Sequence, residues 1–310
     1  MNENKLILLC GSRIALPVMR DLVFYKQLGV VVIPEHCTEF IQQVEMLLRD
    51  MSIPILVVNR KNYVMELEKA IKKYSISIGL MATFTYKLPA SVIRLPAKGF
   101  YNLHPGPLPG YRGPDPIFQQ IRNQEPFAGI TLHKVDEDFD TGAVVLFERI
   151  KLLDTDTYGT VTTKLSELSS RMVNTLIKMT GFDFEIPSRP QDQALAKYFP
   201  RQGASDITID WKNMEAATII ALINACNPWN KGAVAQLNNK IIRLLEGDKL
   251  AEKLNKPQEP GTIINFTDHA MEIACMNGES LSIRIISVDE GIMSAIRLLQ
   301  LGIIAGNRFQ

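Results

Sequence analysis

The chain has 310 residues, of which 46% are hydrophobic and 22% charged, and its formal net charge is +1 at pH 7. This length predicts two domains, and the composition is that of an ordinary globular protein. The near-zero charge excludes a general attraction to nucleic acid or to an anionic membrane surface. No apolar run is long enough to span a membrane, and the five apolar residues after Lys5 are too few for a signal-peptide core. The four cysteines are scattered and are expected to be buried free thiols, so the sequence predicts a cytoplasmic protein.

The first part of the chain alternates short apolar runs with amphipathic segments. Strands are expected at residues 6–10, 30–33, 55–58 and 76–81, and helices at residues 14–28, 38–51 and 63–74. This alternation predicts a doubly wound, mostly parallel α/β sheet with helices on both faces, a Rossmann-like arrangement. Ligands bind such sheets beyond the carboxyl ends of the strands. Because the chain contains no G-x-G-x-x-G sequence, the dinucleotide-binding interpretation is weak.

The next apolar run ends in Asn102 and His104, and a loop rich in proline and glycine follows as far as Pro116. Residues two apart in a strand point to the same side, so the amide and the imidazole are expected to lie together. The prolines restrict the backbone of the loop, and its glycines permit a ligand to approach closely. We favour a reactive pocket here over the alternative, a surface connection after a capped strand end.

Beyond this loop we expect a helix at residues 116–122, strands at 127–133 and 143–150 around an acidic turn, and a long helix at 157–178. Residues 183–204 are broken by three prolines and are interpreted as a linker. Residues 207–211 are expected to enter a helix that ends near Ala225. Five short strands are then expected, at residues 233–237, 241–245, 261–266, 271–274 and 281–288. The predicted organisation is a catalytic domain at residues 1–182 and a small open β-barrel of the OB type at residues 205–310.

Three side chains suggest acyl-transfer chemistry. Asn102 offers a hydrogen-bond donor, His104 offers an imidazole that can hold or release a proton, and the Asp140 carboxylate can orient the imidazole and stabilise its cation. Since no serine or cysteine is placed to act as a nucleophile with them, and Cys10 is expected in the core, we expect direct attack by an amine on a bound acyl group. His133 is interpreted as a packed or surface histidine. A metal site that combines it with His104 and Asp140 matches no strong ligand motif, so no metal is expected.

These residues belong to a larger ordered set of motifs. Asn102-x-His104 is followed by Leu108-Pro109, Tyr111-Arg112-Gly113-x-x-Pro116-Ile117, Gly129-Ile130-Thr131-Leu132-His133 and Asp140-Thr141-Gly142. The set resembles the 10-formyltetrahydrofolate-dependent formyltransferases. The resemblance implies that Asn102, His104 and Asp140 are the catalytic residues and that 10-formyltetrahydrofolate is the formyl donor. It further implies that the folate lies against Phe84, Thr85, Tyr86, Leu88, Gly106, Pro107, Leu108, Pro109, Asp136 and Asp138.

The resemblance continues through the second domain. Asp210-Trp211, Asn227-Pro228-Trp229, Pro260-Gly261-Thr262-Ile263 and the motif at residues 291–295 are similar to methionyl-tRNA formyltransferases, and amino-arabinose nucleotide formyltransferases are similar here too. The chain departs from the family at Gly106-Pro107, where Ser-Leu is usual, which stiffens the loop and removes a hydroxyl. It also lacks the basic insertion that the tRNA enzymes carry after the second strand, because residues 34–40 contain no lysine or arginine.

The charge of the second domain indicates which kind of formyl acceptor to expect. Residues 205–310 contain ten lysines and arginines against twelve aspartates and glutamates, although Lys249, Lys253 and Lys256 form a local cluster. Phosphate contacts dominate binding to tRNA, so a tRNA-binding module should be basic. We therefore expect the formyl acceptor to be a small primary amine, such as an amino-sugar nucleotide, with initiator methionyl-tRNA as the alternative. A non-catalytic binding module and hydrolysis of the formyl donor remain as further alternatives.

Overall fold

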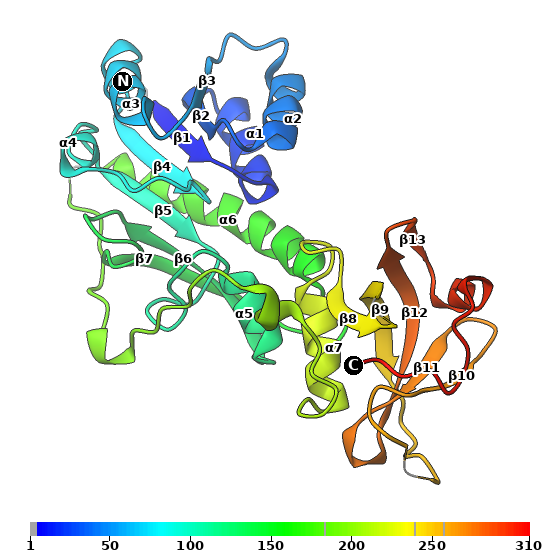
Figure 1. Ribbon diagram of the computed structural model, residues 1–310. Helices are drawn as coiled ribbons and strands as arrows, with labels where there is room; N and C mark the ends of the chain where they lie inside the picture. The colour runs from blue at the N-terminus through cyan, green and yellow to red at the C-terminus, as the bar shows by residue number, and fades with distance from the viewer. Residues whose placement is uncertain (1–4, 183, 239, 257) are drawn as a thin grey trace. The chain divides into compact units, whose positions relative to one another are not determined.

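The computed structural model describes residues 5–182, 184–238, 240–256 and 258–310 (Figure 1). These residues form two compact units. The first unit takes its residues from 1–116, 128–150 and 162–199, and the second from 117–127, 151–161 and 200–310. Residue 183, where the expected linker begins, and residues 1–4, where the expected first domain begins, lie outside the described residues.

The first unit is built on a seven-stranded sheet with the strand order β3-β2-β1-β4-β5-β6-β7. The strands from β3 to β5 are parallel, and β6 runs antiparallel to β5. All residues of β1 are buried, as expected for a strand covered on both faces. The strands are β1 (Leu6–Cys10), β2 (Leu28–Pro34), β3 (Ile55–Val58), β4 (Ile78–Ala82), β5 (Phe100–His104), β6 (Phe127–Lys134) and β7 (Val144–Lys151).

Helices cover both faces of this sheet. On one face, α3 and α4 contribute Leu67, Ile71 and Val92 to a core cluster with side chains of the central strands. On the other face, α1 and α6 lie side by side, and Asp21 of α1 accepts a 2.9 Å hydrogen bond from Asn174 of α6 (Figure 1). The helices are α1 (Leu16–Phe24), α2 (Thr38–Leu48), α3 (Tyr63–Lys73), α4 (Ala90–Ile93), α5 (Pro116–Arg122) and α6 (Tyr158–Thr180).

The second unit contains a six-stranded antiparallel sheet, with the path β10-β11-β12-β9-β8 and β13 paired to β12. The helix α7 (Ala216–Ala225) is buried along most of its length, which explains its almost entirely apolar sequence. The strands are β8 (Ala233–Leu237), β9 (Lys240–Lys249), β10 (Ile263–Phe266), β11 (Met271–Ala274), β12 (Ser280–Val288) and β13 (Gly291–Ser294). The mostly parallel first sheet and the small antiparallel second sheet confirm the predicted fold class.

Several predicted boundaries were wrong. Residues 207–211 do not enter a helix: the backbone N–H of Ile209 donates to the carbonyl of Val234 in β8, and α7 begins only at Ala216. The predicted helix at residues 14–28 is a 3-10 turn followed by α1, which ends at Phe24, and Leu28 already begins β2. The strand β13, which pairs with β12, was not predicted.

The cysteines are all free, and three of them are buried, whereas Cys37 is half-buried, contrary to the expectation of a buried thiol. Burial raises the pKa of Cys10, and it raises the pKa values of Cys226 and Cys275 to about 12. These thiols therefore stay protonated at neutral pH and are poor nucleophiles. Among the described residues, no helix has the length and apolar character needed to cross a membrane.

Candidate active site

The carboxyl end of β5 and the adjoining part of β6 form a row of polar side chains, most of them buried. The antiparallel register pairs Asn102 with His133 and His104 with Thr131. All four side chains therefore point to the same side of the sheet. His104 and His133 are 4% and 2% exposed, so both imidazoles are removed from bulk water.

Asp140 reaches this row from the turn between β6 and β7. Its Oδ1 atom lies 3.4 Å from Nδ1 of His104, and its side chain is 11% exposed. Its Oδ2 atom accepts a 3.0 Å hydrogen bond from the backbone N–H of Gly113. The structure thus brings together Asn102, His104 and Asp140, which the sequence indicates as catalytic. Their roles in a reaction stay a prediction.

His133 is a member of the site that the sequence analysis treated only as a packed or surface histidine. Burial lowers the pKa of His133 to about 4, the charge of protonated His104 acts in the same direction, and the Asp140 carboxylate opposes both. The ring is therefore neutral at pH 7. Its Nδ1 atom lies 2.7 Å from the carbonyl oxygen of Lys134, so Nδ1 carries the proton and donates it.

This tautomer fixes the orientation of Asn102. The Nε2 atom of His133 can only accept, and it faces Nδ2 of Asn102 at 3.1 Å. The Asn102 amide therefore donates one of its two N–H groups to His133. Only the register between β5 and β6 reveals this contact, because the two residues are 31 positions apart in the sequence.

Both ring nitrogens of His104 face oxygen atoms. Nε2 lies 2.6 Å from the carbonyl oxygen of Tyr111, and Nδ1 faces the Asp140 carboxylate. An imidazole with one proton can donate to only one of these oxygens, whereas an imidazolium donates to both. The arrangement therefore suits a protonated His104, whose positive charge is offset by Asp140.

The loop at residues 106–109 packs directly against this row. The hydroxyl of Thr131 donates to the carbonyl of Gly106 at 2.7 Å and accepts a 3.2 Å hydrogen bond from the backbone N–H of Leu108. A Cβ atom at Gly106 would lie 2.9 Å from Nε2 of His104 and 2.7 Å from Cβ of Pro116. Glycine at this position therefore permits the loop to lie against the imidazole.

The residues expected to bind the donor lie on three segments. Phe84 and Leu88 are buried in the core cluster with Phe100, and Tyr86 packs against that cluster. Thr85 and Pro107 are more accessible, as are Asp136 and Asp138. Lys87 and Asp138 form a 3.0 Å ion pair that joins the segment at residues 84–88 to the acidic turn. The two segments are therefore neighbours, and their binding role stays a prediction.

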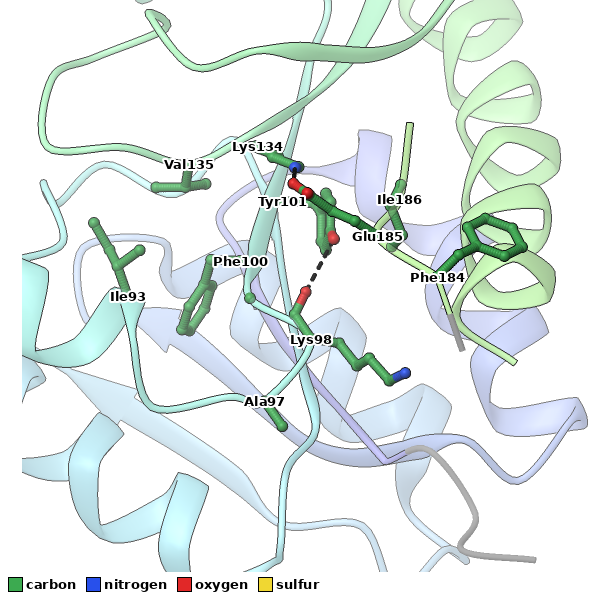
Figure 2. Close-up of a pocket in the computed structure, with 11 residues that line it drawn as sticks. Ile93, Ala97, Lys98, Phe100, Tyr101, Lys134, Val135, Phe184, Glu185 and Ile186 are labelled. Atoms are coloured by element: carbon green, nitrogen blue, oxygen red, sulfur yellow. Dashed lines mark hydrogen bonds and ion pairs between the residues drawn. The ribbon is translucent and has the colours of Figure 1, made fainter. Parts of the chain in front are cut away.

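Cavities flank the sheet of the first unit among the described residues. A cavity of about 430 Å³ lies at the amino end of β5, where Phe100 and Val135 form part of its wall and Lys134 pairs with Glu185 at 2.8 Å (Figure 2). A second cavity, of about 400 Å³, lies beyond the carboxyl ends of β1 and β2 and is lined in part by Ser12 and Arg13. Within the described residues, no three His, Cys, Asp or Glu side chains are grouped so that they could hold a metal ion.

Two family descriptions match this chain. Residues 30–177 match "Formyl transferase", and residues 203–300 match "Formyl transferase, C-terminal domain". The chain belongs to the formyl transferase family. This confirms the resemblance drawn from the motifs around Asn102 and Asp140, and it places both units of the chain within the family.

The sequence relatives and structural neighbours of this chain carry different names. A methionyl-tRNA formyltransferase of Kosmotoga olearia is 32% identical over 211 residues, which are 68% of this chain and 66% of that protein, so the match spans less than two thirds of the relative. The structure of HypX from Aquifex aeolicus with tetrahydrofolic acid has a TM-score of 0.64 at 18% identity, with 96% of this chain and 47% of that chain covered. The N-formyltransferase of Helicobacter canadensis in complex with folinic acid and dTDP-3-aminofucose has a TM-score of 0.64 at 15% identity, with 90% and 98% covered. At these identities the two structural matches establish the fold.

Proposed function

We propose that this chain transfers a formyl group from 10-formyltetrahydrofolate to a small primary amine, such as an amino-sugar nucleotide. The observation that carries the proposal is the network of Asn102, His104, His133 and Asp140 at the carboxyl end of β5, in which both imidazoles are buried. Such a network supplies hydrogen-bond donors and a proton-carrying group at one place without a covalent nucleophile.

The reaction forms a bond between the amine nitrogen and the formyl carbon, breaks the bond from that carbon to N10 of the folate, and moves a proton from the amine to N10. The second N–H of Asn102 and the imidazolium of His104 are the donors available to stabilise negative charge on the formyl oxygen. Since Nε2 of His104 is bound to the Tyr111 carbonyl in this structure, that bond is exchanged for one to the ligand when the site is filled. Asp140 stabilises the imidazolium throughout.

The surroundings of the site fit a folate. The segment at residues 84–88 offers the half-buried aromatic ring of Tyr86, which packs against the buried side chains of Phe84 and Leu88. The opposing turn offers the carboxylates of Asp136 and Asp138. An aromatic heterocycle with N–H donors pairs well with an apolar surface next to hydrogen-bond acceptors.

The charges of the second unit support a small acceptor over tRNA. Arg284 pairs with Glu246 at 2.8 Å and with Asp248, and Arg308 pairs with Glu259 at 3.5 Å. Lys249, which belongs to the only lysine cluster noted in the sequence of this unit, pairs with Glu279 at 2.5 Å. Cations already neutralised by carboxylates have less capacity to bind phosphates.

The 400 Å³ cavity beyond β1 and β2 offers a place for a small acceptor. Ser12 at its edge is hydrogen-bonded at 2.9 Å to the hydroxyl of Thr83, which follows β4, the neighbour of β5. The cavity therefore lies along the same sheet edge as His104. Arg13 and Glu39 both line it, so the cavity offers a cation for an anionic group of the acceptor and a carboxylate for its amine.

Formylation of methionyl-tRNA is the second candidate, and the name of the Kosmotoga olearia relative favours it. One experiment distinguishes the two candidate functions. The protein is incubated with 10-formyltetrahydrofolate and one kind of acceptor, which is either a panel of amino-sugar nucleotides and amino-acid-derived amines or charged initiator tRNA. Release of tetrahydrofolate is followed by absorbance, and the formylated product by mass spectrometry. Turnover with a small amine supports the proposal, turnover with tRNA alone selects the second candidate, and acceptor-independent turnover identifies donor hydrolysis. No turnover with any acceptor contradicts formyl transfer.

A further inference from the structure

Residues 186–199 lie against the loops that carry the candidate catalytic residues. Val144 and Arg189 exchange two backbone hydrogen bonds of 2.8 Å. Farther along, the N–H of Arg112 donates to the carbonyl of Lys197 at 3.0 Å, and the N–H of Phe199 donates to the carbonyl of Arg112 at 2.9 Å. The segment is thus fixed on both sides of Gln191.

Every polar atom of the Gln191 side chain is used in this position. Its Nε2 atom donates to the carbonyl oxygens of Asp140 and Gly142, each at 2.8 Å. Its Oε1 atom accepts from Nε and Nη2 of Arg112, at 3.2 and 2.7 Å. Gln191 and Arg112 are each only 9% exposed, so these bonds form with little competition from water.

The turn that Gln191 contacts has an unusual backbone. Asp140 has a φ angle of +59°, a region that a non-glycine residue rarely adopts. A Cβ atom at Gly142 would lie 1.8 Å from the carbonyl oxygen of Lys134, so the turn presses against the end of β6. A backbone of this kind persists only where the surrounding structure holds it.

The consequence of this backbone is the position of the Asp140 carboxylate. In this backbone conformation, the carboxylate accepts a hydrogen bond from the N–H of Gly113 and faces Nδ1 of His104. Arg112 precedes Gly113 directly, so the guanidinium that anchors Gln191 also belongs to the loop that binds the carboxylate. Gln191 therefore connects the two chain segments that determine where the carboxylate points.

We propose that Gln191 is a positioning residue, which holds the Asp140 turn so that the carboxylate faces His104. The proposal rests on the proposed formyl transfer for its effect on rate, but its geometric part is independent of activity. Gln191→Glu is the decisive variant, because the carboxylate still accepts from Arg112 but can no longer donate to the two carbonyls. Gln193→Ala is the matched control: Gln193 is exposed and accepts from the same Arg112 at 3.1 Å.

For Gln191→Glu we expect kcat to fall about 10- to 100-fold, the size expected for a small displacement of a catalytic group, with KM for donor and acceptor nearly unchanged. Gln193→Ala should keep the wild-type kcat. Crystal structures of the wild type and Gln191→Glu should show the Asp140 carboxylate displaced from His104 in the variant. An unchanged Asp140 turn, or equal kcat values for the wild type and Gln191→Glu, overturns the proposal. A wild type with no transfer activity contradicts the proposed function instead, and the displacement of Asp140 still decides the role of Gln191.

Discussion

Two groups of polar side chains, one in each unit, are held in opposite ways. In the first unit, His104, His133, Arg112 and Gln191 are almost fully buried, and each is hydrogen-bonded in a connected network. In the second, the ion pairs of Arg284 and Arg308 lie exposed at the surface. Buried polar groups are strongly perturbed by their surroundings, whereas exposed pairs contribute little to stability. This difference supports placing the proposed chemistry in the first unit.

The largest effect is expected at Asn102. In Asn102→Ala, the proposed oxyanion donor is lost, and kcat for formyl transfer should fall on the order of 100- to 1000-fold. The variant also leaves the buried Nε2 atom of His133 without its donor, which should lower the free energy of unfolding by about 1 to 3 kcal/mol. Steady-state kinetics and urea unfolding measure the two effects separately.

Asn174→Ala is the control for this change, since Asn174 bonds Asp21 between helices and not a residue of the row. It should keep the wild-type kcat. A near-normal rate for Asn102→Ala would remove Asn102 from the reaction.

The second largest effect concerns how the free energy of unfolding depends on pH, and its cause is His133 in the first unit. Its pKa falls from 6.5 in the unfolded chain to about 4 in the folded protein, mainly through burial. Between these values the unfolded chain binds a proton that the folded protein does not, so acidification destabilises the fold. The loss begins as the pH falls below about 6.5, is complete below about 4, and is on the order of 3 kcal/mol.

The measurement is the free energy of unfolding from pH 7 to pH 4 for the wild type and His133→Gln. Glutamine can still accept from Asn102 but has no titrating group. The wild type should lose stability relative to the variant as the pH is lowered. Parallel curves for the two proteins would mean that the His133 pKa is not lowered by folding.

A third prediction concerns the close approach of the 106–109 loop to His104. In Gly106→Ala, the added methyl meets Pro116 and the imidazole, so we expect a loss of about 1 to 3 kcal/mol of stability and a lower kcat. Gly110→Ala is matched to it within the same loop, because its Cβ would meet only the Pro107 carbonyl at 3.7 Å. Thermal unfolding and kinetics of the two variants should differ. Equal behaviour would show that the loop does not need glycine at residue 106.

The sequence predicted the parts of this molecule that depend on local pattern. Apolar runs located β1 to β5, and the two-residue period placed Asn102 and His104 on one side. It could not predict contacts that depend on register or on distant segments. His133 meets Asn102 only through the β5–β6 pairing, and Gln191 reaches a turn 51 residues earlier in the chain.

The helix predicted at residues 207–211 was wrong for the same reason, because a contact with a distant segment determines the structure there. Its apolar spacing is compatible with a helix, but the N–H of Ile209 and the β-bridge between Thr208 and Val234 attach the segment to β8. A tertiary hydrogen bond of this kind overrides weak local propensity. The short strands of the second unit could nevertheless be predicted from the sequence, because turns interrupt the apolar runs between them.

The smallest effect on stability is expected in the second unit. In the double variant Glu246→Gln with Asp248→Asn, Arg284 loses both carboxylate partners. Because the pair is exposed, the free energy of unfolding should change by less than about 1 kcal/mol.

Affinity for tRNA should respond more clearly than stability in the same variant. If the carboxylates keep the cations of this sheet from phosphates, the double variant should bind tRNA more tightly than the wild type at low salt, and the difference should disappear as salt is raised. Fluorescence anisotropy with labelled tRNA measures both proteins over a salt series. Tight wild-type binding that the variant does not improve would mean that tRNA is bound through other cations, and it would favour the tRNA acceptor over a small amine.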